Sequence, residues 1–214
     1  MKKKIIAPFF IVAALMLVVS QVSFAQDMEG KIGIGARVAY VNYSDDDLGY
    51  GIDMEFDEVA MYGGNLTYFV HSYLSLELSV DYLETDVDLE ALGVSVDIGD
   101  LEQIPVLLSL RTHLSTNPKV SPYLTVGIGY YFNDFDMKSS IPAGYDVDPD
   151  DSFGYHLGGG IEYFFNNHFA FNLDFKYIWS NVDVDLEEPG GYSVNDKNLD
   201  VDFFSAGIGF KYYF

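Results

Sequence analysis

Apolar and polar residues alternate along most of the chain after the first 25 positions. The alternation recurs in eight segments, and no long stretch with the 3.6-residue period of an α-helix competes with it. Because successive side chains of a β-strand point to opposite faces, each segment predicts a strand with one apolar and one polar face. The predicted strands span residues 31–43, 59–70, 74–85, 104–114, 123–133, 153–165, 169–180 and 201–214.

The two faces of these strands suit lipid and a narrow interior. In the third segment Leu76, Leu78 and Val80 alternate with Glu77 and Ser79, and the polar faces of the other segments are mostly Gly, Ser, Asn, Thr and charged residues. Eight strands close around a space just wide enough for such side chains, and closure pairs every backbone group. We predict an all-β fold, an eight-stranded antiparallel up-and-down transmembrane β-barrel. The alternative is a soluble periplasmic lipocalin-like barrel, whose apolar faces point inward.

The connections between the predicted strands also indicate a membrane barrel. Three are short, at 71–73, 115–122 and 166–168. Four are long and acidic, at 44–58, 86–103, 134–152 and 181–200. Short turns on one side and long loops on the other are typical of outer-membrane barrels, which also carry aromatic girdles at both interfaces. The candidate girdle residues are Tyr40, Tyr62, Tyr68, Tyr82, Tyr130, Tyr155, Tyr163, Tyr177, Trp179 and Tyr212.

The first 25 residues predict a secretory signal peptide. Three lysines at positions 2–4 precede an apolar stretch at 5–19, and Ser23-Phe24-Ala25 places small residues before a cleavage site after Ala25. The alternative is a membrane anchor, but the stretch is shorter than the roughly 20 residues of a spanning helix. We therefore expect residues 26–214 to form the mature barrel domain.

Composition excludes several classes of function. The chain has a net charge of −22, and loss of the predicted leader, with three Lys and no acid, makes it −25. Nucleic acid is not an expected partner, because its phosphates require Lys and Arg. The chain has no Cys, which excludes disulfides, thiolate zinc sites and a Cys nucleophile.

The end of the chain resembles a known sorting signal. The run from Gly207 to Phe214, which places aromatic residues at alternate positions and ends in Phe, resembles the C-terminal signal of bacterial outer-membrane barrels. The resemblance implies insertion by the outer-membrane assembly machinery of a Gram-negative cell, with outer-membrane lipid and lipopolysaccharide as surroundings. We expect a monomer.

Three further stretches are distinctive, namely residues 64–69 with 74–78, residues 104–108 with 122–130, and the Gly158-Gly159-Gly160-Ile161-Glu162-Tyr163-Phe164 run with the closing aromatic residues. Together they resemble the OmpW family of small eight-stranded outer-membrane barrels. Members of that family pass small hydrophobic molecules across the outer membrane. The resemblance implies the same function for this chain.

The inward face sorts into two candidate layers if both termini are periplasmic. Four cations and four acids lie near mid-height and should form ion pairs, since unpaired buried charge is costly. This predicts a plug that opposes a water channel; an ion path is the alternative. The plug residues are Arg37, Glu77, Asp81, Arg111, Glu162, Asp174, Lys176 and Lys211.

Apolar inward residues gather nearer the outside. They predict a path by which a hydrophobic solute enters and then leaves sideways between strands. Pro105 lacks an N–H, so it removes one ladder bond where the wall could open. The alternative is that these side chains simply fill the barrel end. The path residues are Val41, Met61, Leu83, Pro105, Leu107, Tyr131, Ile178 and Phe203.

The acidic loops suggest a role for divalent ions. Residues 45–47, the acids at 146, 148, 150 and 151, and the acids at 183, 185, 187 and 188 supply oxygens that suit Ca²⁺ or Mg²⁺. Such ions could bridge the loops to lipopolysaccharide phosphates; the alternative is mobile, solvated loops. EF-hand spacing is absent, and we predict no metal site and no cofactor.

Two other functions compete with solute passage. One is a non-transporting surface or structural barrel of the OmpA/OmpX type with acidic interaction loops. The other is a lipid-modifying enzyme, because Ser152 and His156 share the inward face near the outer rim and Asp151 is adjacent. No recognisable catalytic motif accompanies them, and a His that donates a hydrogen bond in the lumen is the favoured interpretation of His156. We expect no enzymatic activity and no catalytic residue.

Overall fold

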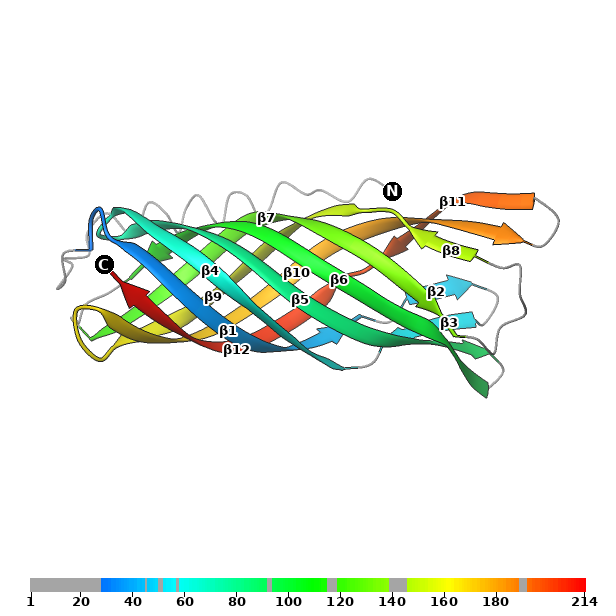
Figure 1. The fold of residues 1–214 in the computed structure, drawn as a ribbon, viewed down its shortest axis with the longest axis horizontal. Coiled ribbons are helices and arrows are strands. Elements are labelled where there is room, and N and C mark those ends of the chain that lie inside the picture. The colour runs from blue at the N-terminus through cyan, green and yellow to red at the C-terminus, as the bar shows by residue number, and fades with distance from the viewer. Residues whose placement is uncertain are drawn as a thin grey trace.

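The computed structural model describes residues 28–44, 46–49, 52–56, 58–91, 94–114, 119–138, 146–188 and 192–214. Eight strands form a closed, all-antiparallel β-barrel, as predicted (Figure 1). They are β1 (Ile32–Tyr43), β4 (Val59–His71), β5 (Leu74–Ala91), β6 (Val94–His113), β7 (Val120–Met137), β9 (Ser152–Phe164), β10 (Phe169–Glu188) and β12 (Phe203–Tyr213). Four short strands extend the sheet, namely β2 (Asp46–Gly49), β3 (Ile52–Phe56), β8 (Asp146–Pro149) and β11 (Tyr192–Asp200).

The first and last barrel strands close the sheet. β1 pairs with β12 from Gly33 opposite Tyr213 to Tyr43 opposite Phe203, and every other barrel strand pairs with its neighbour along the chain. Closure leaves no unpaired strand edge in the barrel wall. Among the residues that the structure describes, no helix is long and apolar enough to cross a membrane.

Side-chain exposure confirms the predicted direction of the two faces. Leu78 and Val80 are 45% and 49% exposed on the outer wall, whereas Glu77 and Ser79 between them are 1% and 2% exposed in the interior. Phe175 on β10 is likewise exposed. The alternative of a soluble lipocalin-like barrel is therefore wrong, because it would place the apolar faces inside.

The strands are longer than predicted, and the four long connections are not simply loops. β5 continues to Ala91 and β6 begins at Val94, while β2, β3, β8 and β11 occupy stretches predicted as loops. Figure 1 shows these extensions at the end of the barrel opposite the C-terminus. Short turns mark the periplasmic end of such barrels, so the extensions lie on the extracellular side.

The polarity of the two strand faces inverts where the strands leave the apolar band of the membrane, which explains why the predicted strands are too short. Along β5 the inward residues change from Asp81 to Leu83 and Val87, and the outward residues change from Tyr82 to Glu84 and Asp86. The side-chain period is unchanged, but the outer face now meets water in place of hydrocarbon. A sequence prediction that identifies the outward face by its apolar residues therefore ends each strand where the outward residues become polar.

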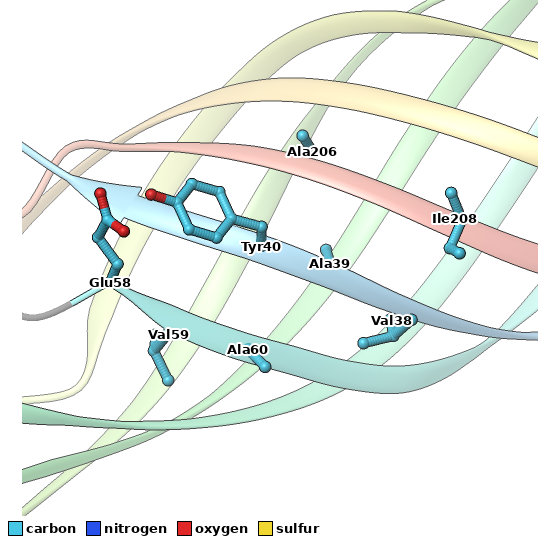
Figure 2. Close-up of a pocket in the computed structure, with 8 residues that line it drawn as sticks. All are labelled: Val38, Ala39, Tyr40, Glu58, Val59, Ala60, Ala206 and Ile208. Carbon is cyan, nitrogen blue, oxygen red and sulfur yellow. The ribbon is translucent and has the colours of Figure 1, made fainter.

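The outer wall has a hollow between β4, β1 and β12. It has a volume of about 370 Å³ and is lined by Val38, Ala39, Tyr40, Glu58, Val59, Ala60, Ala206 and Ile208 (Figure 2). Small residues on β4 and β12 flank Tyr40, since Tyr40 lies opposite Ala60 on one side and Ala206 on the other.

The predicted signal peptide and much of the acidic sequence lie outside the described part. Residues 1–27, with the cleavage site after Ala25, are not described, nor are Asp45 and the side chains at 46, 47, 146, 148, 183, 185, 187 and 188. The signal peptide and the binding of divalent ions by these acids stay predictions.

The outward face of β5 offers a test of which side meets lipid. Leu78→Arg should lower the free energy of unfolding by about 2–4 kcal/mol, because it places a charge near the middle of the bilayer. Asp136→Arg, on the exposed extension of β7, should change it by less than about 0.5 kcal/mol. Reversible urea unfolding in lipid vesicles measures both, and equal losses would contradict the assignment.

Candidate functional site in the barrel interior

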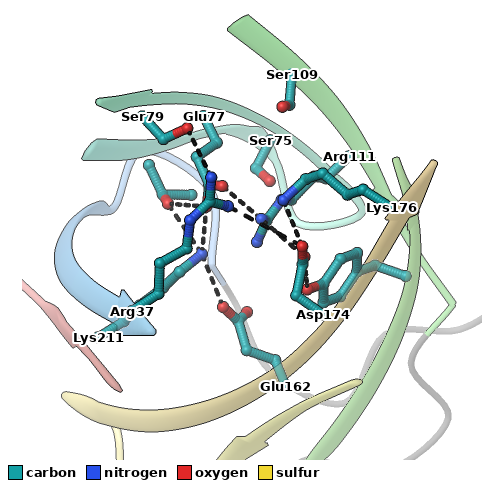
Figure 3. Close-up of polar contacts among 12 residues, drawn as sticks. Arg37, Ser75, Glu77, Ser79, Ser109, Arg111, Glu162, Asp174, Lys176 and Lys211 are labelled. Atoms are coloured by element: carbon teal, nitrogen blue, oxygen red, sulfur yellow. Dashed lines mark hydrogen bonds and ion pairs between the residues drawn. The ribbon is translucent and has the colours of Figure 1, made fainter. Parts of the chain in front are cut away.

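The eight charged residues predicted to face the interior form one continuous series of ion pairs (Figure 3). All eight side chains are buried. They come from six of the eight barrel strands, so the network joins strands from all sides of the barrel. These strands are β1, β5, β6, β9, β10 and β12. Four positive and four negative charges balance, which limits the cost of burying them.

Asp174 on β10 is the hub of this network. One carboxylate oxygen accepts from Lys176 and lies 4.0 Å from the Arg37 guanidinium. The other accepts from Arg111 at 3.2 Å and from the Tyr123 hydroxyl at 2.6 Å. One carboxylate therefore links β10 to β1, β6 and β7 across the lumen.

Glu77 on β5 is a second branching point. It accepts from Arg111 through one oxygen and from Lys211 at 2.6 Å through the other. Lys211 also pairs with Glu162 at 3.1 Å. Asp81 completes the series through Arg37, whose Nε lies 2.8 Å from its Oδ1. The lumen at this height is filled with charged groups held to one another.

Glycines on the inner wall make room for these side chains. A Cβ added to Gly160 would lie 2.5 Å from the Tyr123 hydroxyl, and one on Gly127 would lie 2.6 Å from the His156 ring. These distances are far shorter than carbon contacts allow. Glycine on the polar face of the strands therefore permits large side chains from facing strands to fill a narrow barrel.

An apolar compartment lies on the extracellular side of the charged network. Seven of the eight predicted path residues pack into a single buried cluster, together with Ala39, Tyr43, Val182 and Val201, which were not predicted. The cluster is closely filled, since Val41, Leu83 and Tyr131 have no exposed surface. Pro105 is buried in the wall beside the cluster but is not one of its members.

A polar layer covers this compartment on its outer side. The Tyr43 hydroxyl donates to Oε1 of Gln103 at 3.1 Å, and Nε2 of Gln103 donates to Oδ1 of Asn133 at 2.8 Å. Asn133 in turn donates to the backbone oxygen of Asp150 at 2.8 Å. Tyr43, itself a member of the apolar cluster, and Asn133 lie one inward position further out than Val41 and Tyr131, and Gln103 lies two inward positions further out than Leu107. The bond from β1 to β6 crosses the lumen.

The barrel wall has a break in pairing beside Pro105. β5 and β6 are paired from Leu74 to Val80, which lies opposite Val106, and pairing resumes only at Leu83 opposite Gln103. Through this interval β5 stays paired with β4 and β6 stays paired with β7. The interruption is therefore confined to the β5–β6 seam, and Leu83 and Leu107 of the apolar compartment flank it.

A second apolar cluster closes the periplasmic end, and the sequence reading missed it. It consists of Met28, Phe69, Phe164, Ala170 and Tyr213. Tyr213 donates to Glu162 at 2.9 Å, which ties the cluster to the charged network. Phe69 and Tyr213 occupy inward positions near strand ends, directly beside outward aromatic residues. Their inward position in the alternating pattern is the sequence feature that could have identified this cluster.

The Ser–His–acid grouping, the less favoured alternative at the rim, does not form. His156 is buried in the lumen, where Nε2 lies 2.9 Å from the Ser109 hydroxyl. Ser152 hydrogen-bonds the Ser180 hydroxyl at 3.1 Å, and Asp151 accepts from Tyr130 at 3.1 Å. The physical reason is distance along the strand, because Ser152 and His156 are four residues apart on β9, about 13 Å at the rise of a β-strand, and each finds a partner on another strand.

The acids on the strand extensions face water and repel one another. Asp86 and Asp100 lie opposite each other on β5 and β6, and Lys138 bridges them at 3.4 and 3.1 Å. A hydrogen bond between the two carboxyl groups raises the pKa of Asp86, whereas the hydrogen bond from Lys138 lowers the pKa of Asp100. Among the described residues, no three His, Asp or Glu side chains are grouped closely enough to hold a metal ion.

Removing the hub should destabilise the barrel. Asp174→Asn leaves Arg37, Arg111 and Lys176 without their shared carboxylate, so we expect the free energy of unfolding to fall by about 3–5 kcal/mol. Urea titration in lipid vesicles measures the loss. Asp136→Asn, which removes an exposed acid, is the matched control, and a loss of the same size in both variants would contradict a role for the ion pairs.

The chain matches the family described as Outer membrane protein beta-barrel domain over residues 10–214. It is 26% identical over 164 residues to the uncharacterized outer-membrane protein y4mB of Sinorhizobium fredii, covering 76% of this chain and 70% of that protein. It is 25% identical over 155 residues to the outer membrane protein AlkL of Ectopseudomonas oleovorans, covering 70% of this chain and 64% of that protein.

Solved structures share the fold. The outer membrane protein OprG of Pseudomonas aeruginosa superimposes with a TM-score of 0.75 at 23% identity, covering 90% of this chain and 99% of OprG. The outer membrane protein W of E. coli gives a TM-score of 0.51 at 21% identity, covering 87% of this chain and 98% of that one. The resemblance to small OmpW-like outer-membrane barrels is confirmed by these matches.

Proposed function

We propose that this chain, which belongs to the Outer membrane protein beta-barrel domain family, lets small hydrophobic molecules cross the outer membrane passively. Its location is the outer membrane. The resemblance to the OmpW family implies this class of solute, and the arrangement of the barrel interior supports it. The route has three parts, which are an outer polar layer, the apolar compartment and the seam beside Pro105.

The apolar compartment supports a hydrophobic solute. Val41, Met61, Leu107, Ile178 and Phe203 present aliphatic and aromatic surface to one another in the barrel interior. A solute that replaces some of these contacts exchanges apolar surface for apolar surface, so it loses little favourable packing. A sugar would leave its hydroxyl groups without partners there, at a cost of several kcal/mol.

The charged network supports a route that does not continue straight through the barrel. Below the compartment Arg37, Asp81 and Asp174 are buried and paired. Separating these ion pairs to admit a hydrophobic molecule would leave buried charges uncompensated, at a cost of about 3–5 kcal/mol for each broken pair. The Phe69 and Tyr213 cluster closes the periplasmic end as well. Release toward the periplasm is therefore unfavourable.

The seam between β5 and β6 supports a sideways exit. Pro105 cannot donate a ladder hydrogen bond, and the β5–β6 pairing omits Asp81 and Tyr82, which lie between the paired residues Val80 and Leu83. On its inner side this seam holds Pro105 and Asp81, the latter paired with Arg37, between Leu83 and Leu107 of the compartment, and on its outer side it is flanked by Val80 and Val106 of the lipid-facing wall. The contiguity of the apolar compartment and this unpaired seam is the observation on which the proposal rests.

The outer polar layer supports control of access. Tyr43, Gln103 and Asn133 are linked by two hydrogen bonds above the compartment. Each such bond contributes only about 0.5–1.5 kcal/mol, because water can replace the partners when the bond breaks. A solute arriving from outside can therefore part this layer at a much lower cost than the ion pairs below.

A non-transporting surface or structural barrel is the second candidate. The filled interior favours it, because Val41, Leu83 and Tyr131 leave no exposed surface in the compartment. Under this reading the apolar cluster stabilises the barrel, and the acidic extensions carry the function. Solute flux separates the two candidates.

Flux into liposomes tests the proposal. Wild-type barrel should pass an apolar fluorescent probe and retain a polar sugar. Leu107→Asn should slow the probe about tenfold or more, because it places an amide without partners in the compartment. Resistance of the folded barrel to unfolding in detergent confirms folding of the variant. Equal flux of probe through protein-containing and protein-free liposomes would support the non-transporting barrel.

Restoring the missing donor tests the exit. Pro105→Ala provides an N–H that can pair across the β5–β6 seam, so probe flux should fall about two- to tenfold. Pro122→Ala is the matched control, because Pro122 is also a strand proline but lies at the periplasmic end of β7. If both variants or neither slow the probe, the exit does not lie at this seam.

A further inference from the structure

Two polar atoms at the inner end of the apolar compartment lack a hydrogen-bond partner among the residues that the structure describes. They are the hydroxyl oxygen of Tyr131 and Nδ1 of His156, whose residues are 0% and 1% exposed. Tyr131 belongs to the compartment, and His156 lies opposite its member Ile178 on the neighbouring strand. A buried polar atom without a partner is costly, so this place suits a guest that forms hydrogen bonds.

Two inward glycines of β7 bring these polar side chains close together. The Tyr131 hydroxyl lies 2.9 Å from the position that a Cβ on Gly129 would take, and the His156 ring lies 2.6 Å from the corresponding position on Gly127. Gly127 and Gly129 are successive inward positions, about 7 Å apart along the strand. The hydroxyl and the ring therefore cover adjacent positions of one inner wall, where a single small polar group between them can reach both.

Other contacts hold both side chains in place. Nε2 of His156 lies 2.9 Å from the Ser109 hydroxyl, and Ser109 is drawn at the edge of the charged network in Figure 3. The Tyr131 ring packs edge-on against Phe203, with ring centroids 6.3 Å apart. Tyr131 also lies opposite Pro105 in the β6–β7 pairing. The two partnerless atoms are thus positioned before a guest arrives, and they lie beside the seam.

The charge balance of the lumen favours an uncharged guest. The four positive and four negative side chains of the network already neutralise one another, so a further buried charge would have no counter-ion. A hydroxyl group can accept a hydrogen bond from one atom and donate to another without any charge. Further out, Val41 and Leu83 offer only apolar surface. The guest that matches both parts is an alkyl chain that ends in one hydroxyl group.

We propose that the apolar compartment binds an alkyl alcohol, with the alcohol hydroxyl between Tyr131 and His156. The proposal rests on the proposed function, because the same compartment receives the solute, and it defines the solute as a hydrocarbon chain with one uncharged polar end. Tyr131 donates to the alcohol oxygen, and the alcohol hydroxyl donates to Nδ1 of His156, whose Nε2–H is turned to Ser109. One water molecule can take the same place, and the alcohol replaces it while forming the same hydrogen bonds.

Nitrogen chemical shifts of the histidine side chains test this site. The purified barrel in lipid nanodiscs, with isotope-labelled histidine, is titrated with octanol or with octane at equal mole fractions of the lipid. Octanol should shift the Nδ1 signal of His156, which is identified by its loss in His156→Gln, because the donor to that atom changes. Octane has no hydroxyl group and should leave this signal unchanged. The absence of a shift with octanol, or equal shifts with both compounds, would overturn the proposal.

A pair of tyrosine variants separates the hydroxyl contact from general effects of octanol on the bilayer. Tyr131→Phe keeps the ring and removes the hydroxyl, so the octanol fraction at half-saturation should rise about two- to tenfold, the range for one hydrogen bond. Tyr213→Phe is the matched control, because Tyr213 is also buried in the lumen but donates to Glu162 at the periplasmic end. It should titrate as the wild type does. Equal changes in both variants, or no change in either, would overturn the site.

Octanoate tests whether the guest must be uncharged. It has the same chain length but carries a carboxylate, so at neutral pH it should bind about tenfold more weakly than octanol. Tighter binding of octanoate than of octanol would overturn the assignment of an uncharged guest.

The flux of the apolar probe distinguishes failure of this site from failure of the proposed function. If the probe crosses but octanol leaves the His156 signal unchanged, the compartment passes hydrocarbons without this polar contact, and the alcohol site is wrong. If octanol shifts the signal and Tyr131→Phe weakens its binding although the probe does not cross, the site is supported in a barrel that does not transport.

Discussion

The rest of this structure depends on one constraint, which is that backbone N–H and C=O groups in hydrocarbon must be paired within the protein. A closed antiparallel barrel satisfies it, because each strand pairs on both sides and β1 pairs with β12. Closure then divides every strand into a lipid face and a lumen face. With eight strands the lumen is narrow, so the inward residues must either be small or meet partners from the facing wall.

The lumen answers that requirement in layers. Glycines at positions such as Gly127 and Gly160 leave room for large facing side chains, and the charged residues neutralise one another through Asp174 and Glu77. Apolar clusters fill the space on either side of the charges. These layers differ in how costly they are to open, since apolar contacts can be exchanged for a hydrophobic guest whereas buried ion pairs cannot.

The barrel wall also differs locally in its strand pairing and in the size of its outward side chains. A proline in the middle of a strand interrupts the ladder at one seam, and alanines beside Tyr40 hollow the outer surface at another while the ladder stays intact. An interrupted ladder weakens the wall, whereas an intact ladder under small side chains only shapes its surface. The interrupted ladder beside Pro105 and the hollow over an intact ladder are thus physically distinct features of one barrel.

The sequence alone determined the barrel strands, the direction of their faces, the identity of the eight charged residues of the lumen and seven members of the apolar cluster, because the period of two survives in any register. It could not determine where the strands end, since Leu83 and Glu84 keep the period but exchange polarity once the outer face leaves hydrocarbon. Tertiary structure decided which charges meet, placing Asp174 at the hub, and it paired His156 with Ser109 instead of Ser152. It also decided that Gln103 reaches Tyr43 and that the ladder fails beside Pro105. These contacts join strands distant in the chain, and their register follows from closure of the whole barrel.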